Sequence, residues 1–264
     1  MLIVADNLHV VRPEIARALE ALDPQPIQDL VRRCVQAGAQ AIDLNCGPLT
    51  RAPERRMSFL VEAVRAVTDL PLLLDTTNPT ALDAGLAACG GRAIINGFSL
   101  EPAKLEAILP LARRYDAEIV GYLLHPDSRV PHAADELMAL AVDLFEAYRA
   151  LDLDPARLIV DPVIAPLSWP DGTRHNRAVL TLIRQLPELL GTPVRTMAGL
   201  SNLASGALPL ARKIALEQAF LPMLAAAGLD LLLVNVLHGP TLETARICTD
   251  LLAEGVFAWT PPDG

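Results

Sequence analysis

The chain has 264 residues, of which 52% are apolar and 20% charged, so it can bury a large hydrophobic core. Its formal net charge of −9 argues against nucleic acid as a partner, because binding to phosphates requires a basic face. No apolar run approaches the roughly 18 residues that span a bilayer, and the N-terminus lacks the basic segment of a signal peptide.

Short apolar runs alternate with longer amphipathic segments along the whole sequence. The expected strands are residues 2–5, 39–44, 70–75, 93–96, 118–124, 158–161, 194–200 and 231–236. The expected helices are residues 26–37, 53–67, 81–89, 101–114, 133–151, 178–189, 213–227 and 241–253. The proline-rich tail, residues 259–264, is expected to fray.

This alternation predicts a parallel sheet that is covered by helices on both faces. Eight such units in a chain of this length are typical of a closed (β/α)8 TIM barrel, here a single domain over residues 1–264. An open doubly wound sheet is the alternative. Such a sheet usually has a glycine-rich phosphate-binding turn after its first strand, where this chain has Ala5, Asp6 and Asn7.

The cysteines and histidines are scattered along the chain, without CxxC or HExxH motifs. The four cysteines are Cys34, Cys46, Cys89 and Cys248. This spacing predicts reduced thiols in a cytoplasmic protein and no bound metal.

Polar side chains follow the predicted strands. They are Asp6, Asn7, Asp43, Asn45, Asp75, Asn96, His125, Asp161, Ser201, Asn202 and Asn235. In a barrel the carboxyl ends of all strands meet at one mouth, where the chemistry of such folds takes place. Some of these residues can instead cap the following helices. Asp75, Asn96 and Asp161 directly end apolar runs, which favours side chains that point into or over the barrel.

Carboxylates and carboxamides with few cations suit a neutral heterocycle that is rich in N–H donors. A carboxylate accepts two parallel N–H bonds, whereas an amide both donates and accepts. The sequence offers no phosphate cradle of the kind a nucleotide requires. A pterin ring fits this set of groups.

Five short motifs, in order along the chain, carry a resemblance to a known family. They are AIDLNCGP (41–48), LLLDTTNPTALDAGL (72–86), RAIING (92–97), LIVDPVIAP (158–166) and GLSNLA (199–204). The sequence resembles the pterin-binding methyltransferases that act with corrinoid proteins, in particular those that transfer methyl between methyltetrahydrofolate and a corrinoid iron–sulfur protein. The folate domain of cobalamin-dependent methionine synthase is a more distant relative. The family fold is the (β/α)8 barrel.

The resemblance implies roles for individual residues. Asp75, Asn96 and Asp161 would hold the pterin ring, and the Asn202 amide oxygen would stabilise protonated N5 while the methyl group leaves. Ser205 and Lys213 would contact the substrate at the rim.

The resemblance also implies the substrate and the partners. Tetrahydrofolate, or its 5-methyl form, would be the substrate, and a corrinoid-binding partner protein would bring the cobalt. Relatives imply a homodimer. The direction of methyl transfer stays open.

The rim departs from the family pattern. Relatives end the first strand with a Glu–Arg–Ile–Asn-like segment, whereas this chain has Asp6 and His9 at its ends. Ser205 replaces a common Gln. Lys213 and Glu217 stand where relatives have Arg and Asn, and Arg212 is a competing match for the Arg. These departures leave the partner protein and the exact pterin open.

Two segments are candidate docking elements for the partner protein. They are the predicted loop 165–176, with Trp169 and His175, and the turn around His238.

Two other functions are weighed against methyl transfer. Dihydropteroate synthase belongs to the same superfamily, but it ends its sixth and seventh strands with DPG-type and SRK-type segments. This chain has DPVIAP and SNLA there. A non-catalytic pterin carrier is the other alternative, and the retention of Asn202 argues against it.

Overall fold

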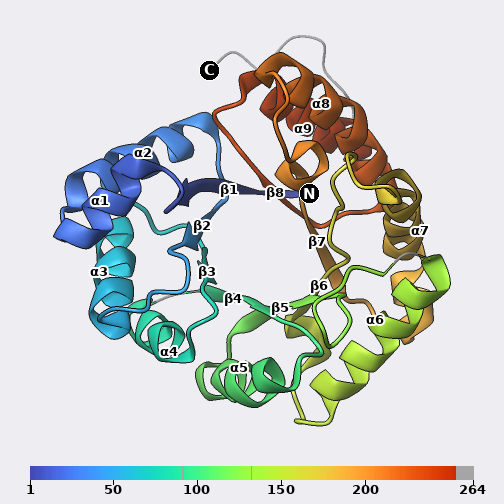
Figure 1. Cartoon of the computed structure of the whole chain (residues 1–264), viewed down its shortest axis with the longest axis horizontal. Helices are drawn as coiled ribbons and strands as arrows, with labels where there is room; N and C mark the ends of the chain where they lie inside the picture. The colour runs from blue at the N-terminus through green and yellow to red at the C-terminus, as the bar shows by residue number, and fades with distance from the viewer. Residues whose placement is uncertain (91, 132, 254–264) are drawn as a thin grey trace.

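Eight parallel strands close into a barrel in the order β1 to β8, and helices surround it (Figure 1). This computed structural model describes residues 1–90, 92–131 and 133–253. It confirms the predicted (β/α)8 TIM barrel. The tail at 259–264 lies outside the described residues. Within the described part of the chain, no helix is long and apolar enough to cross a membrane.

Each strand of the barrel pairs with its sequence neighbours, and β1 closes the ring with β8. The strands are β1 (Leu2–His9), β2 (Ala41–Asn45), β3 (Leu72–Asp75), β4 (Ala93–Phe98), β5 (Glu118–Tyr122), β6 (Leu158–Asp161), β7 (Arg195–Gly199) and β8 (Leu231–Val234). β1 therefore continues four residues beyond its predicted end, and β5 stops two residues short of it.

The helices follow the predicted pattern with two differences. They are α1 (Pro13–Ala21), α2 (Pro24–Ala37), α3 (Pro53–Arg65), α4 (Pro79–Ala88), α5 (Pro102–Tyr115), α6 (Ala134–Arg149), α7 (Gly172–Leu190), α8 (Leu210–Ala227) and α9 (Gly239–Leu252), with the short 3-10 helices η1 (Pro155–Arg157) and η2 (Leu200–Ala204). α1 is an additional helix that the sequence analysis did not predict. α7 begins six residues earlier than expected, so residues 172–176 of the predicted loop 165–176 belong to this helix.

The interior of the barrel is filled by one apolar side chain from each strand. They are Val4, Ala41, Leu73, Ile94, Val120, Ile159, Met197 and Leu231. A second, larger apolar cluster lies between the strands and the helices. Because side chains on a strand alternate between its two faces, the residue two positions further along each strand also points into the barrel. The interior cluster therefore fixes which residues face the mouth.

Candidate functional site

The layer above the apolar interior is polar. Two residues after each interior side chain stand Asp6, Asp43, Asp75, Asn96, Tyr122, Asp161, Gly199 and Leu233. Three of the predicted site residues, Asp75, Asn96 and Asp161, thus belong to one layer at the carboxyl ends of β3, β4 and β6. Tyr122 completes the fifth position of this layer.

Asn96 is held at the mouth by two side-chain hydrogen bonds. Its Nδ2 donates to Asp43 Oδ1 at 3.1 Å, and its Oδ1 accepts from the Tyr122 hydroxyl at 2.5 Å. Asn96 and Asp43 are both buried. The two partners fix the direction of the amide, so one donor of Asn96 Nδ2 has a set orientation toward a ligand.

Asp75 is oriented in the same way by its neighbour strand. Asn45 Nδ2 donates to Asp75 Oδ2 at 2.5 Å, and in the described part of the chain no other side chain donates to this carboxyl group. Asp75 is half-buried at the end of β3. Its second oxygen is therefore available to accept a hydrogen bond from a ligand.

Asp161 lies at the end of β6 and is 5% exposed. Its Oδ1 accepts from the Val163 backbone N–H at 2.7 Å. Val163 adopts φ 61°, which is strained for a β-branched residue. The strain is tolerated because both backbone groups are used: the Val163 carbonyl oxygen lies 2.6 Å from His175 Nε2. The turn therefore aims the Asp161 carboxyl group into the barrel mouth.

The carboxyl groups of this layer have raised pKa values because burial disfavours their charged forms. Burial raises the pKa of Asp161 to about 7 and that of Asp75 to about 6. Burial and the neighbouring Asp75 also raise the pKa of Asp43, and burial raises that of Asp6. No Lys or Arg among the described residues contributes to these shifts. The mouth is thus an acidic layer in which burial dominates, and the nearby His238 offsets it only in part, at Asp6.

Asn202 stands above this layer, on η2 rather than on the strand itself. A Cβ on residue 199 would lie 3.5 Å from Asn202 Nδ2, so the amide packs over the space that Gly199 leaves in the layer. The Asn202 side chain is exposed and forms no hydrogen bond within the described part of the chain. It is free to bind a ligand that enters the mouth.

The other two predicted site residues lie further out on the rim. Ser205 ends η2, is exposed, and its Oγ contacts the Ser201 carbonyl oxygen at 3.5 Å. Lys213 lies half-buried in the first turns of α8. The neighbouring Ser201 instead connects η2 to the polar layer, because its Oγ donates to Asp6 Oδ2 at 3.0 Å.

Polar side chains at the ends of β1 and β8 form a hydrogen-bonded network that the sequence did not predict. Asn7 Nδ2 donates to Asn235 Oδ1 at 2.6 Å, and Asn235 Nδ2 lies 3.1 Å from His238 Nε2. His238 Nδ1 lies 3.5 Å from Glu217 Oε2. Glu217, expected at the rim, is 4% exposed and accepts from Thr241 Oγ1 at 2.9 Å.

His175 was predicted to lie in a loop that docks the partner protein. In the structure its side chain is buried instead. It lies in the first turns of α7 and is 2% exposed. Its Nδ1 is 2.8 Å from the Pro131 carbonyl oxygen, and its Nε2 faces that of Val163. Both ring nitrogens thus lie within hydrogen-bonding distance of backbone carbonyl oxygens. His175 thereby joins the loops that follow β5 and β6.

Within the described residues, no group of three His, Cys, Asp or Glu side chains is arranged to hold a metal ion. The four cysteines are free and buried.

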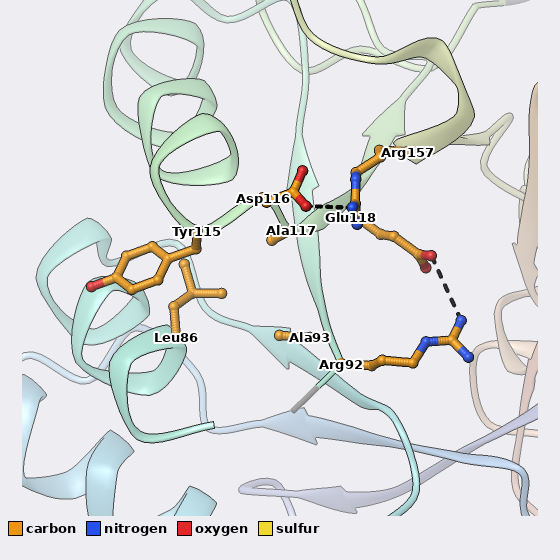
Figure 2. Close-up of a pocket in the computed structure, with 8 residues that line it drawn as sticks. All are labelled: Leu86, Arg92, Ala93, Tyr115, Asp116, Ala117, Glu118 and Arg157. Carbon is orange, nitrogen blue, oxygen red and sulfur yellow. Dashed lines mark hydrogen bonds and ion pairs between the residues drawn. The ribbon is translucent and has the colours of Figure 1, made fainter. Parts of the chain in front are cut away.

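The opposite end of the barrel has a hollow of about 260 Å³ (Figure 2). Its charged groups are paired with one another: Arg157 binds Asp116, Arg92 Nη2 lies 3.7 Å from Glu118 Oε1, and Arg195 Nη2 lies 3.1 Å from Glu118 Oε2. These pairs join the amino ends of neighbouring strands. The unpaired acidic groups are at the other end.

Comparison with known families decides the identity of the fold. The family model for pterin binding enzymes matches residues 14–235. The chain belongs to this family. A methylcorrinoid:tetrahydrofolate methyltransferase of Eubacterium limosum is 26% identical over 87% of this chain and 83% of its own length. A methionine synthase of Mycobacterium tuberculosis is 25% identical over 83% of this chain, which spans only 19% of that protein.

Solved structures share the architecture of this pterin-binding barrel. A dihydropteroate synthase of Yersinia pestis has a TM-score of 0.68 at 19% identity, covering 94% of this chain and 91% of its own. That of Xanthomonas albilineans has a TM-score of 0.62 at 22% identity, covering 88% of each chain. At these identities the likeness shows the fold alone.

Proposed function

We propose that this protein is a methyltransferase that moves a methyl group between N5 of methyltetrahydrofolate and the cobalt of a corrinoid on a partner protein. The observation that carries the proposal is the acidic layer at the barrel mouth with the Asn202 amide above it. The similarity to the methylcorrinoid:tetrahydrofolate methyltransferase supports it.

The acidic layer matches the hydrogen-bonding groups of a pterin. Asp161 and Asp75 each have a carboxylate oxygen for the ring N–H groups and the exocyclic amine, and Asn96 can donate to the ring carbonyl group. Hydrogen bonds to a charged acceptor contribute about 1.5–3 kcal/mol each. Hydrogen bonds from a ligand with several N–H donors also offset the free-energy cost of burying these carboxylates.

In this proposal Asn202 acts at the reacting nitrogen. The methyl group leaves from a tertiary amine, and an unprotonated N5 is a poor leaving group. A carboxamide does not titrate near neutral pH, so Asn202 is not an acid. Its oxygen accepts from protonated N5 and stabilises the charge there, while the proton comes through the polar network of the mouth. The corrinoid supplies a nucleophilic cobalt for the methyl carbon.

Dihydropteroate synthesis is the alternative reaction, and it must hold a pyrophosphate leaving group. The segments DPVIAP and SNLA, at the ends of β6 and β7, differ from the DPG-type and SRK-type segments that handle this group in dihydropteroate synthases. This difference favours methyl transfer.

The test is a spectroscopic assay of the purified protein with free cobalamin. Methyltetrahydrofolate with cob(I)alamin should yield tetrahydrofolate and methylcob(III)alamin. In the reverse reaction, tetrahydrofolate with methylcob(III)alamin should yield methyltetrahydrofolate and cob(I)alamin. Tetrahydrofolate binding without methyl exchange in either direction would make the protein a carrier and overturn the proposal.

A further inference from the structure

Asp6 is the one carboxyl group of the polar layer that has no part in the proposed pterin clamp. Asp75 and Asp161 would accept hydrogen bonds from the ring, and Asp43 accepts from Asn96. A carboxylate that accepts from a ligand is ionised and has no proton to donate. Asp6 is therefore the carboxyl group of the layer that remains available for another role.

The Asp6 side chain reaches the segment that carries Asn202. The pairing of β1 with β2 is irregular between Ala5 and Leu8, and such irregularities re-aim side chains near active sites. Asp6 Oδ2 accepts from Ser201 Oγ at 3.0 Å, although β8 separates β1 from β7, the strand that precedes η2 (Figure 1). The bond therefore spans β8 and places the Asp6 carboxyl group at the mouth, beside η2.

Asp6 and Asn202 border the same part of the mouth. The layer positions on β7, β8 and β1 are Gly199, Leu233 and Asp6, so Asp6 is the titratable group among these three. A Cβ on residue 199 would lie 3.5 Å from Asn202 Nδ2 and 4.0 Å from Leu233 Cδ2. Within the described residues Asp6 Oδ1 accepts no hydrogen bond, so this oxygen is free to face a ligand.

The surroundings of Asp6 favour its protonated form, because burial is the largest influence on its pKa and raises it. The hydrogen bond from Ser201 lowers this pKa, the negative charge of Glu217 raises it, and His238 lowers it. The other titratable groups that interact electrostatically with Asp6 are Cys34 and Asp43.

His238 is the other titratable group near this side of the mouth, but its ring nitrogens are directed at the polar network. Nε2 lies 3.1 Å from Asn235 Nδ2, and Nδ1 lies 3.5 Å from Glu217 Oε2. A proton from His238 would have to leave through these neighbours, whereas Asp6 contacts η2 directly.

We propose that Asp6 is the catalytic acid that protonates N5 of the pterin as the methyl group leaves. The electron pair of the N5–methyl bond stays on N5, which takes the proton of Asp6. Cobalt(I) supplies the electron pair of the new methyl–cobalt(III) bond. The Asn202 oxygen and the Asp6 carboxylate then share the new N5–H, and Asp6 regains a proton from solvent beside the exposed Ser201. The inference rests on the proposed function and names the proton donor for it.

Single-turnover methyl transfer from saturating methyltetrahydrofolate to cob(I)alamin, followed over a range of pH, tests the proposal. The wild-type rate constant should be level at low pH and fall about tenfold per pH unit above the pKa of Asp6. Asp6→Asn should lower the rate constant on this plateau about 10²–10⁴-fold and remove the break in the profile. Asp6→Glu keeps a carboxyl group, so it should restore most of the rate and shift the break.

Asn202→Ala is the matched control, because a carboxamide does not titrate. This variant should slow transfer at every pH and keep the wild-type break. Calorimetry should show that Asp6→Asn still binds tetrahydrofolate, and if that variant does not fold, an unchanged break in Asp6→Glu would overturn the proposal. A wild-type profile in Asp6→Asn would overturn the role of Asp6 and leave methyl transfer in place. Wild-type protein that transfers no methyl would instead overturn the proposed function and this role together.

Discussion

Replacing Asp161 with Asn should stabilise the folded protein at neutral pH relative to acidic pH, and it should weaken pterin binding. Asp161 is 5% exposed, and burial raises its pKa from 3.8 to about 7. The folded protein therefore holds a proton on this group that the unfolded chain has lost above about pH 4. The stability that comes from this proton is complete below the unfolded-state pKa and is lost as the pH rises through the folded-state pKa.

The magnitude follows from the two pKa values. Between about pH 5 and about pH 8, this one carboxyl group should lower the free energy of unfolding of the wild-type protein by about 3 kcal/mol. Asn does not titrate, and its Oδ1 can still accept from the Val163 N–H. The Asn side chain adds an amide donor, and any free-energy cost of burying it does not depend on pH. The difference in stability between Asp161→Asn and the wild type should therefore move by about 3 kcal/mol in favour of the variant.

Urea unfolding at several pH values measures this difference, with Asp69→Asn as the control because Asp69 is exposed. Calorimetry on the same variant should show pterin binding weakened by about 1.5–3 kcal/mol. A stability difference that does not change with pH would refute the buried, uncompensated carboxylate. Unchanged affinity would refute its place in the pterin clamp.

Three further predictions concern the mouth of the barrel. Asn202→Ala should slow methyl transfer about 10²–10³-fold while folate binding changes less, and single-turnover kinetics showing an unchanged rate would remove its catalytic role. Pterin affinity should fall as the pH drops through about 7, by up to about tenfold per pH unit, because the ligand needs the ionised form of Asp161; a flat calorimetric profile in the wild type would contradict this. Treatment with a chelator should leave methyl transfer from methyltetrahydrofolate to free cobalamin intact, and loss of activity that zinc restores would show that a metal site had been missed.

The barrel was predictable because each strand is a continuous apolar run between helical segments, the pattern of a sheet that is buried on both faces. α1 was missed because it is only nine residues long and its N-cap, Arg12, makes no side-chain capping bond. The early start of α7 was missed for a related reason, since the helix opens with Gly172 and the Asp171 side chain does not cap it.

The site was predictable where a polar residue ends its strand directly. Asp75 and Asp161 end β3 and β6, so their positions follow from the pattern. The fifth strand was predicted to extend to residue 124, which made His125 the expected strand-end residue. β5 ends at Tyr122, whose hydroxyl donates to Asn96. His125 lies three residues beyond the strand, and its Nε2 is 3.6 Å from Glu136 Oε2 at the start of α6. The two-residue step from the interior Val120 to Tyr122 was the available signal.

The acidic layer links the energetics of the fold to the proposed function. Burial raises the pKa of Asp43 and of Asp75, and the neighbouring Asp75 raises that of Asp43 further. Ionising these buried groups therefore costs free energy that an apolar mouth would not require. A bound ring with several N–H donors would stabilise the ionised forms of these groups. Binding should therefore release protons near neutral pH, because it lowers the raised pKa values. The acidic side chains would thus lower the stability of the free protein and raise its affinity for the ligand. This explains why the layer contains acids rather than the apolar residues that fill the barrel below it.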